Sequence, residues 1–169
     1  MVQRVVIIAL TAAALWFGYR WLFPNDAAQI RAALDRIEES LDAGPADEGE
    51  VSRLARAAGV RSRLDPKITV DAGPPFSRMT GRDAIIGTIA RVNSTVGDLD
   101  VGFDDVQIAV DPDRTSAKVY LTAEARYRDG TGARGFDARE LDVTFRRLDG
   151  DWVVSEVALV RTLEPVTPK

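Results

Sequence analysis

Hydrophobic residues recur at two different spacings along this chain, and the change of spacing divides it into two parts. Between residues 25 and 95, apolar side chains recur three or four positions apart, as they do on one face of an α-helix. From residue 98 onward, apolar and polar residues alternate, as they do in β-strands with one buried face. The pattern therefore predicts helices in the first part and a sheet in the second.

Three amphipathic helices are expected in the first part. The first begins with a cap at Asn25 and carries its apolar stripe over residues 30–41. The second begins at a capping box over residues 47–50, and the third at a capping box over residues 80–83. A short strand is expected at residues 67–71, between the second helix and the third. Each helix thus has an apolar face that must pack against another part of the protein.

Four long strands joined by short turns are expected in the second part. Short turns make consecutive strands antiparallel neighbours. In the first of these strands the apolar residues change parity, which predicts a β-bulge near Asp104 and Asp105. The strands are expected over residues 101–110, 117–127, 136–148 and 152–159.

Together these elements predict an α+β domain, in which three N-terminal amphipathic helices pack against a curved, mainly antiparallel sheet. The domain is expected to span residues 25–163. Residues 164–169 include two prolines and are expected to form a disordered tail.

Residues 1–24 differ from the rest of the chain. An uncharged, mostly apolar run covers residues 5–19, and it extends over residues 5–23 if the Arg20 side chain reaches the lipid headgroups. This predicts one transmembrane helix, and hence a single-pass membrane protein that contacts the bilayer through residues 5–23 and holds its folded domain outside the cytoplasm. A cleaved signal peptide and a buried core helix are the alternatives.

The residue counts exclude several kinds of chemistry. The 169 residues include no histidine and no cysteine, so Ser-His-Asp triads, Cys-His pairs, disulfides and imidazole or thiolate metal ligands are excluded. Lysine and arginine together number 22, against 26 aspartates and glutamates. This acidic balance argues against a nucleic acid as partner.

Two motifs that can bind cofactors or metals are interpreted as structural. Gly130, Gly132 and Gly135 match the dinucleotide-binding pattern, but a strand rather than a helix follows them, which favours a hairpin loop. The aspartates between residues 98 and 105 lack the glycine and the bidentate glutamate that a calcium loop requires. We therefore predict no cofactor and no metal ion.

The order of the elements resembles that of the nuclear transport factor 2-like superfamily over residues 26–163. The residues that carry the resemblance are the start of the third helix at residues 81–84 and the closing hairpin at residues 149–154. The resemblance implies a cone-shaped fold with an apolar pocket between helices and sheet, and in many members a dimer through the outer sheet face. Because the superfamily includes ketosteroid isomerases, polyketide cyclases and scytalone dehydratase as well as non-catalytic binding domains, it does not select an activity.

Strand parity selects candidate residues for such a pocket. Tyr127 shares the apolar face of its strand, and Glu156 shares parity with Trp152 and Val154. A carboxylate among apolar neighbours has a raised pKa and can act as a base, so Glu156 and Tyr127 are the catalytic candidates. The alternatives are an edge position for Glu156 and simple core packing for the aromatic residues. The residues expected to line the pocket are Phe103, Leu121, Tyr127, Phe145, Trp152 and Glu156.

The opposite parity predicts an outer sheet face that is either solvated or a polar dimer surface. Its expected residues are Tyr120, Thr122, Glu124, Arg126, Thr144 and Arg146.

Three functions remain open at this point. The first is a membrane-anchored, non-enzymatic domain that binds a protein partner or a small apolar ligand in the cell envelope. The second is a carboxylate-dependent isomerase, lyase or cyclase of a small hydrophobic molecule. The third is a structural domain that only forms homodimers. The absence of histidine favours a non-enzymatic role, because many catalytic members of the superfamily carry His or Asp in the pocket, often with a Tyr.

Overall fold

The computed structural model describes residues 25–42, 58–74 and 78–163 of the chain. Two complete helices and six strands lie in these residues, and residues 58–63 are also helical. In chain order the elements are α2 (Asp26–Leu41), β1 (Leu64–Asp71), β2 (Met79–Thr80), α4 (Arg82–Thr95), β3 (Gly97–Val110), β4 (Ser116–Arg128), β5 (Arg134–Leu148) and β6 (Asp151–Leu163).

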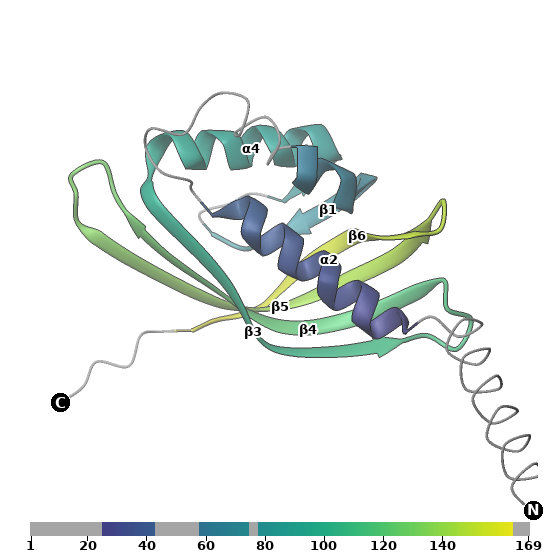
Figure 1. Ribbon diagram of the computed structural model, residues 1–169. Helices are drawn as coiled ribbons and strands as arrows, with labels where there is room; N and C mark the ends of the chain where they lie inside the picture. Colours follow the sequence, from purple (N-terminus) through teal and green to yellow (C-terminus); the bar gives the residue numbers. More distant parts are fainter. Residues whose placement is uncertain (1–24, 43–57, 75–77, 164–169) are drawn as a thin grey trace, which may run out of the picture.

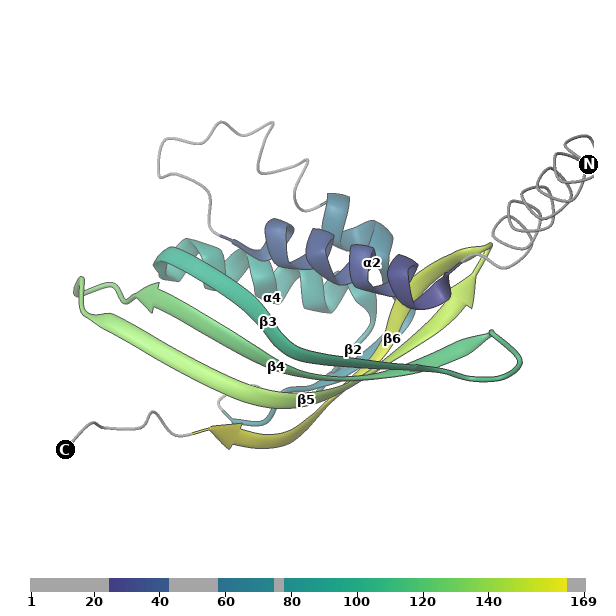
Figure 2. The same cartoon turned by 60° about the horizontal axis from the view of Figure 1, so that its bottom comes forward.

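The six strands form one mixed sheet in the order β2-β1-β6-β5-β4-β3. All neighbouring strands are antiparallel except β1 and β6, which are parallel. Figures 1 and 2 show that the sheet curves strongly and that α2 and α4 lie on its concave side. The predicted α+β class, with helices against a curved and mainly antiparallel sheet, is confirmed.

Helix α2 forms as its sequence predicts. The Asn25 side chain accepts a hydrogen bond from the Ala28 backbone N–H, which satisfies one of the free donors at the helix start. The buried side of α2 includes Ile30, Leu34 and Ile37, the stripe expected from the three-to-four spacing. The apolar stripe therefore faces the sheet.

The start of helix α4 differs in detail from the prediction. The helix begins at Arg82, but the residue before it is Gly81, with a φ of 92° and no side-chain cap. A capping box that begins at Thr80 therefore does not form. Glycine is favoured at this position because it adopts a positive φ without a steric penalty.

Helix α2 also closes one edge of the sheet. The Asp42 carboxylate accepts a hydrogen bond from the Val101 N–H at 2.7 Å, and Glu38 accepts one from the Phe103 N–H at 3.0 Å. Arg31 donates to the Val106 carbonyl oxygen at 3.1 Å. Since β3 is the edge strand, these contacts occupy backbone groups that could otherwise pair with another strand.

The predicted bulge in β3 is confirmed. The register with β4 shifts between Asp104 and Gln107, and Asp105 has a φ of 52°. The extra residue restores the inward orientation of the apolar side chains on both sides of the bulge.

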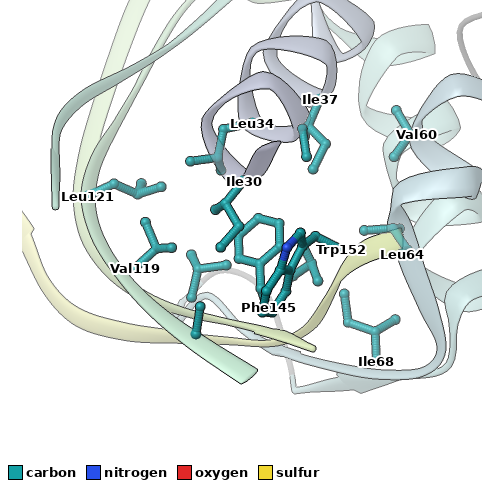
Figure 3. Packing of buried hydrophobic residues seen from close by; sticks show 14 of the residues in the cluster. Ile30, Leu34, Ile37, Val60, Leu64, Ile68, Val119, Leu121, Phe145 and Trp152 are labelled. Carbon is teal, nitrogen blue, oxygen red and sulfur yellow. The ribbon is translucent and has the colours of Figure 1, made fainter. Parts of the chain in front are cut away.

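The core lies between α2 and the central strands (Figure 3). In that view, side chains of α2 point toward β4, β5 and β6, with Phe145 and Trp152 at the centre. The largest buried apolar side chains, each at most 2% exposed, are Trp152, Phe145, Ile30, Ile68, Leu121 and Val119.

The localisation predicted from the sequence, a single-pass membrane protein with an extracytoplasmic domain, is contradicted. Within residues 25–42, 58–74 and 78–163, no helix is long and apolar enough to cross a bilayer. The predicted anchor at residues 1–24 and the predicted tail at residues 164–169 lie outside the described residues. The domain limits drawn from the sequence remain predictions.

Candidate functional site at the open end of the concave face

The strand register defines which side chains share the concave face. Odd-numbered residues of β4 lie opposite odd-numbered residues of β5, from Ala117 opposite Phe145 to Tyr127 opposite Gly135. Ala117 and Phe145 belong to the buried cluster that also contains Ile30 of α2. The odd-numbered residues of both strands therefore face the helices, and the even-numbered residues face outward.

One end of the concave face is closed around Asp26, and we call it the Asp26 end. The Asp26 side chain is 6% exposed and accepts hydrogen bonds from Arg114 Nε at 2.6 Å, Arg147 Nη2 at 2.5 Å and Trp152 Nε1 at 3.3 Å. The guanidinium of Arg147 also lies over the Trp152 ring, 4.9 Å from its centroid. These contacts tie the start of α2 to the β3–β4 turn and to both strands of the β5–β6 hairpin.

The hydrogen bonds decide the charge state of Asp26. Burial alone would raise the pKa of its carboxyl group, but hydrogen bonds from Arg114 and Trp152, together with the positive charges of Arg147 and Arg114, lower the pKa below its ordinary value. The carboxylate is thus held in its charged form. The three donors to Asp26 hold this end of the molecule together, although the buried Arg147 Nε atom has no partner among the described residues.

The opposite end of the face is open, and we call it the β4–β5 end. It comprises residues 97–103 of β3, 123–128 of β4 and 134–141 of β5, around the hairpin that projects beyond α2 in Figure 1. In β4, Ala117, Val119 and Leu121 are at most 1% exposed. The next three concave residues of the same strand, at positions 123, 125 and 127, are all partly exposed.

Two small side chains leave space on the concave side of this end. Ala123 and Ala125 project only a methyl group from the concave face, and the residues opposite them in β5 are Arg139 and Asp137. Beside them, Tyr127 lies over Gly135, where a Cβ atom would come within 2.4 Å of the Tyr127 ring. The ring therefore requires glycine at position 135.

Arg139 and Asp137 form an ion pair on this face. The Arg139 side chain is 11% exposed, and its Nη2 atom lies 2.7 Å from an Asp137 carboxylate oxygen. Arg139 also donates to the carbonyl oxygens of Ala72 and Pro74, the latter at 3.0 Å. Its guanidinium therefore holds the chain that follows β1 against the concave face.

Two polar atoms near this end have no hydrogen-bond partner among the described residues. One is the Tyr127 hydroxyl, and the other is the buried Oδ1 atom of Asn93 in α4. Asn93 lies four residues after Ile89 and so on the same side of the helix, and Ile89 packs against the core. Buried polar atoms in native proteins are nearly always paired, so a vacant acceptor marks a position where a ligand donor would be favourable.

A cleft of about 510 Å³ lies on the convex side of the β4–β5 hairpin. It is lined by Asp98, Asp100, Arg126, Tyr127, Arg128, Arg134, Gly135 and Phe136. Arg128 pairs with Asp98 at 2.6 Å, and Arg126 pairs with Glu124 at 2.6 Å. Its arginines and Phe136 are even-numbered residues of β4 and β5, so the cleft opens away from the concave face on which the Tyr127 ring lies.

The residues predicted to line a pocket separate into three groups. Leu121, Phe145 and Trp152 are fully buried and fill the core, whereas Phe103 is only partly buried and packs against that core. Tyr127 is partly exposed on the concave face. The structure therefore places Tyr127 and Phe103, which lies opposite Ala123, at the β4–β5 end.

The inward orientation predicted for Glu156 is wrong. Val154 pairs with Phe145 but Glu156 pairs with Thr144, so Ser155 is an extra residue that forms a bulge in β6. The bulge reverses the parity after Val154, and Glu156 is exposed on the convex face. The catalytic pair of Glu156 with Tyr127 is therefore not assembled.

The residues predicted for the outer face all lie on the convex side. They are the even-numbered residues Tyr120, Thr122, Glu124, Arg126, Thr144 and Arg146. Tyr120 and Arg161 both donate to Glu140, and these two hydrogen bonds, that from Arg161 first, lower the pKa of the Glu140 carboxyl group. The role of this face as a dimer surface stays a prediction.

Sequence reasoning missed Asp137, Arg139 and Asn93. For the first two a signal was present, because they share odd parity with Leu141, Val143 and Phe145, the apolar face expected for that strand. For Asn93 the signal is its spacing of four residues from Ile89 along the third helix. Among the described residues, no three acidic side chains converge on a metal position.

Comparisons with known proteins support the fold and leave the activity open. No protein-family model and no curated protein matches the sequence. The fold is similar to that of a structure reported as "Putative Scytalone Dehydratase" from Novosphingobium aromaticivorans, with 19% identity and a TM-score of 0.63 over 82% of this chain and 85% of the other. A "putative dehydratase from the NTF2-like family" of Streptomyces avermitilis matches with 14% identity and a TM-score of 0.63, over 81% of this chain and 97% of the other.

A third similar structure is Kfla4162 from Kribbella flavida, with 15% identity and a TM-score of 0.65 over 82% of this chain and 93% of the other. Identities this low report on backbone architecture and not on shared chemistry. The chain has the nuclear transport factor 2-like fold.

Proposed function

We propose that this protein is a non-enzymatic binding domain that holds a small, largely apolar molecule at the β4–β5 end of its concave face. The observation that carries the proposal is the change of exposure along one side of β4. Concave residues up to Leu121 are at most 1% exposed, whereas Ala123, Ala125 and Tyr127 are partly exposed. Among the described residues, the apolar side chains of this part of the concave face are only partly covered, and partly exposed apolar residues in a concave face favour a bound ligand.

The polar groups at this end suit recognition better than catalysis. The Asp137 carboxylate is paired with Arg139, whose other donors bind backbone carbonyls, so both groups are engaged in holding the structure. Glu156, the carboxylate on which a catalytic role depended, is on the other face. The Tyr127 hydroxyl and the Asn93 Oδ1 atom can each hydrogen-bond a polar group of a ligand.

A carboxylate-dependent isomerase, lyase or cyclase is the second candidate. Asp137 and Tyr127 are diagonal neighbours on the concave face, since their partners across the ladder are Ala125 and Gly135. Dehydratase names among the similar structures agree with this candidate without extending to this chain. It predicts that Asp137→Asn abolishes turnover of a substrate while ligand affinity stays within a factor of about two.

The neutral fluorescent probe N-phenyl-1-naphthylamine tests the binding proposal. We expect its fluorescence to rise in a saturable titration with the wild-type protein. Ala125→Leu adds three carbon atoms at the open site and should weaken binding at least about tenfold, because an overpacked site costs about 1–3 kcal/mol. Ala109→Leu is the matched control, since Ala109 is exposed and pairs with Lys118, an outward-facing residue of β4.

The control variant should bind the probe like the wild type. Equal affinities of all three proteins, or no saturable binding to the wild type, would contradict the proposal.

A further inference from the structure

The ion pair between Asp137 and Arg139 uses only one oxygen of the carboxylate. Arg139 Nε and Nη2 lie 2.9 Å and 2.7 Å from the same atom, Asp137 Oδ2. The other oxygen, Asp137 Oδ1, has no partner among the described residues, and the Asp137 side chain is 33% exposed. Because a carboxylate oxygen accepts up to two hydrogen bonds, Oδ1 is an accessible acceptor on the concave face.

The guanidinium group of Arg139 is held in place by the protein. Its Nη1 atom donates to the carbonyl oxygens of Ala72 and Gly73. Its Nη2 atom donates to the carbonyl oxygen of Pro74 at 3.0 Å. The positive charge therefore stays beside Asp137, and the pair has no net charge. A ligand cation would be repelled by Arg139 and a ligand anion by Asp137, so a neutral polar group fits best.

The Tyr127 hydroxyl lies on the same face as this acceptor. Its oxygen is 2.8 Å from the position that a Cβ atom on Gly135 would occupy. Asp137 follows Gly135 by two residues on the same face of β5, a spacing of about 7 Å along a strand. No hydrogen bond joins the two groups in the part of the chain that the structure describes. A polar group of a ligand can therefore lie between them.

Together the two groups select the polar group of the ligand. The Asp137 carboxylate only accepts hydrogen bonds, whereas the Tyr127 hydroxyl can donate one. A hydroxyl group on the ligand can accept from Tyr127 and donate to Asp137 at the same time. An ether or a ketone lacks the donor, and an ammonium group lacks the acceptor.

We propose that Asp137 and Tyr127 recognise a neutral hydroxyl group, so that the ligand of the concave face is an apolar molecule that carries a hydroxyl. The apolar part of this ligand lies against Ala123 and Ala125, the partly exposed alanines of β4. The inference rests on the proposed function, because it concerns the same part of the concave face. It adds the chemical class of the ligand and the residues that select it.

Two probes that differ by one methyl group test the inference. 2-Naphthol has a hydroxyl group and is uncharged at neutral pH, whereas 2-methoxynaphthalene has an ether at the same position and no donor. Both are titrated against the wild type, Asp137→Asn and Tyr127→Phe, with the fluorescence of the probe as the signal. Asp142→Asn is the matched control, because it makes the same change at an exposed residue on the convex face of the same strand.

We expect the wild type to bind 2-naphthol about tenfold more tightly than 2-methoxynaphthalene, as for one hydrogen bond to a charged acceptor. In Asp137→Asn, Arg139 should orient the amide oxygen toward itself and leave the amide N–H groups facing the ligand. The preference should therefore fall below about twofold. Tyr127→Phe keeps the ring and should weaken 2-naphthol binding about fivefold. Asp142→Asn should bind both probes like the wild type.

The preference between the two probes separates recognition from a merely structural effect. If Asp137→Asn weakens both probes equally and keeps the wild-type preference, the inference is overturned. Equal affinity of the wild type for the two probes, unchanged 2-naphthol binding by Tyr127→Phe, or loss of the preference in Asp142→Asn also overturns it. None of these results affects the proposed function, which fails if N-phenyl-1-naphthylamine does not bind the wild type. Far-ultraviolet circular dichroism checks that each variant is folded.

Discussion

At the Asp26 end of the concave face, every odd-numbered residue of β4 is buried to at least 99%, whereas at the β4–β5 end the same series is partly exposed. The residues opposite explain the contrast. Ala117 lies opposite Phe145, but Ala125 lies opposite Asp137 and Tyr127 opposite Gly135. A strand whose side chains alternate regularly between the two faces can therefore contribute to the core along half its length and to a binding surface along the other half. The side chains of the neighbouring strand decide which of the two forms.

The polar groups differ between the two ends as well. Asp26 receives three donors and is 6% exposed, so this carboxylate is fully hydrogen-bonded and stabilises the fold, although the buried Arg147 Nε atom beside it has no partner among the described residues. At the β4–β5 end, the Tyr127 hydroxyl and Arg134 have no partner among the described residues. The Asp26 carboxylate therefore serves the fold, whereas the Tyr127 hydroxyl, unpaired among the described residues, can still hydrogen-bond a ligand.

The largest expected contrast comes from two phenylalanines of β5. Phe145 is 0% exposed and Phe136 is 40% exposed. Phe145→Ala leaves a cavity in the core and should lower the free energy of unfolding by about 4 kcal/mol, whereas Phe136→Ala should cost under about 1 kcal/mol. Urea denaturation followed by tryptophan fluorescence measures both. Similar losses for the two variants would contradict the distinction between the packed core and the exposed convex side of the β4–β5 hairpin.

Removal of one carboxylate at each end should give the next largest difference in the free energy of unfolding. Asp26→Ala leaves Arg147 and Arg114 without their shared partner and should cost about 3 kcal/mol, because loss of one member of a buried ion pair exposes its full desolvation penalty. Asp100 is 66% exposed and lies 3.7 Å from Arg126. Asp100→Ala should therefore cost under about 1 kcal/mol in the same urea measurement. A loss below about 1 kcal/mol for Asp26→Ala means that the Asp26 network does not stabilise the fold.

Enlargement of an alanine tests the same contrast in the opposite direction. Ala117 is 0% exposed, so Ala117→Leu overpacks the core and should lower the free energy of unfolding by about 2 kcal/mol. Ala125→Leu should leave it within about 0.5 kcal/mol, because the added atoms enter an open space. Thermal unfolding by calorimetry compares the two variants. Equal destabilisation would show that the β4–β5 end is as tightly packed as the core.

The smallest expected effect is the pH dependence of the Asp26 network. The folded state lowers the pKa of Asp26, so the carboxylate contributes stability above its ordinary titration range, and that contribution falls as the pH drops through the lowered pKa. The difference in unfolding free energy between wild type and Asp26→Asn should shrink between pH 7 and pH 3. Urea titrations at both pH values give this number, and a difference that grows in acid would reverse the assigned sign.

Much of the sheet was predictable because apolar alternation is a local property. The regular series from Ala117 to Tyr127, the bulge near Asp105 and the cap at Asn25 all appear as local patterns in the sequence, and each is present in the structure. These features depend on residues within a few positions of one another, where backbone geometry alone relates sequence to orientation.

The features that were not predicted depend on contacts between residues far apart in the chain, which a local sequence pattern does not reveal. The bulge at Ser155 is visible only when β5 is aligned with β6, and it moved Glu156 to the convex face. The Asp26 network joins residues 88 and 121 positions apart in the chain. Asp137 and Arg139 share the parity of the apolar face of β5. Charged residues are rarely buried without a partner, and the sequence alone does not show that these two pair with each other.

The central claim is that a ligand binds at the β4–β5 end of the concave face and not in the core. The most direct test is nuclear magnetic resonance of alanine methyl groups during a titration with N-phenyl-1-naphthylamine. We expect saturable chemical-shift changes for the methyl groups of Ala123 and Ala125, and none for Ala117 at the buried end or Ala109 on the outer face. Shifts at Ala117 or Ala109 without shifts at Ala123 and Ala125 would contradict the claim.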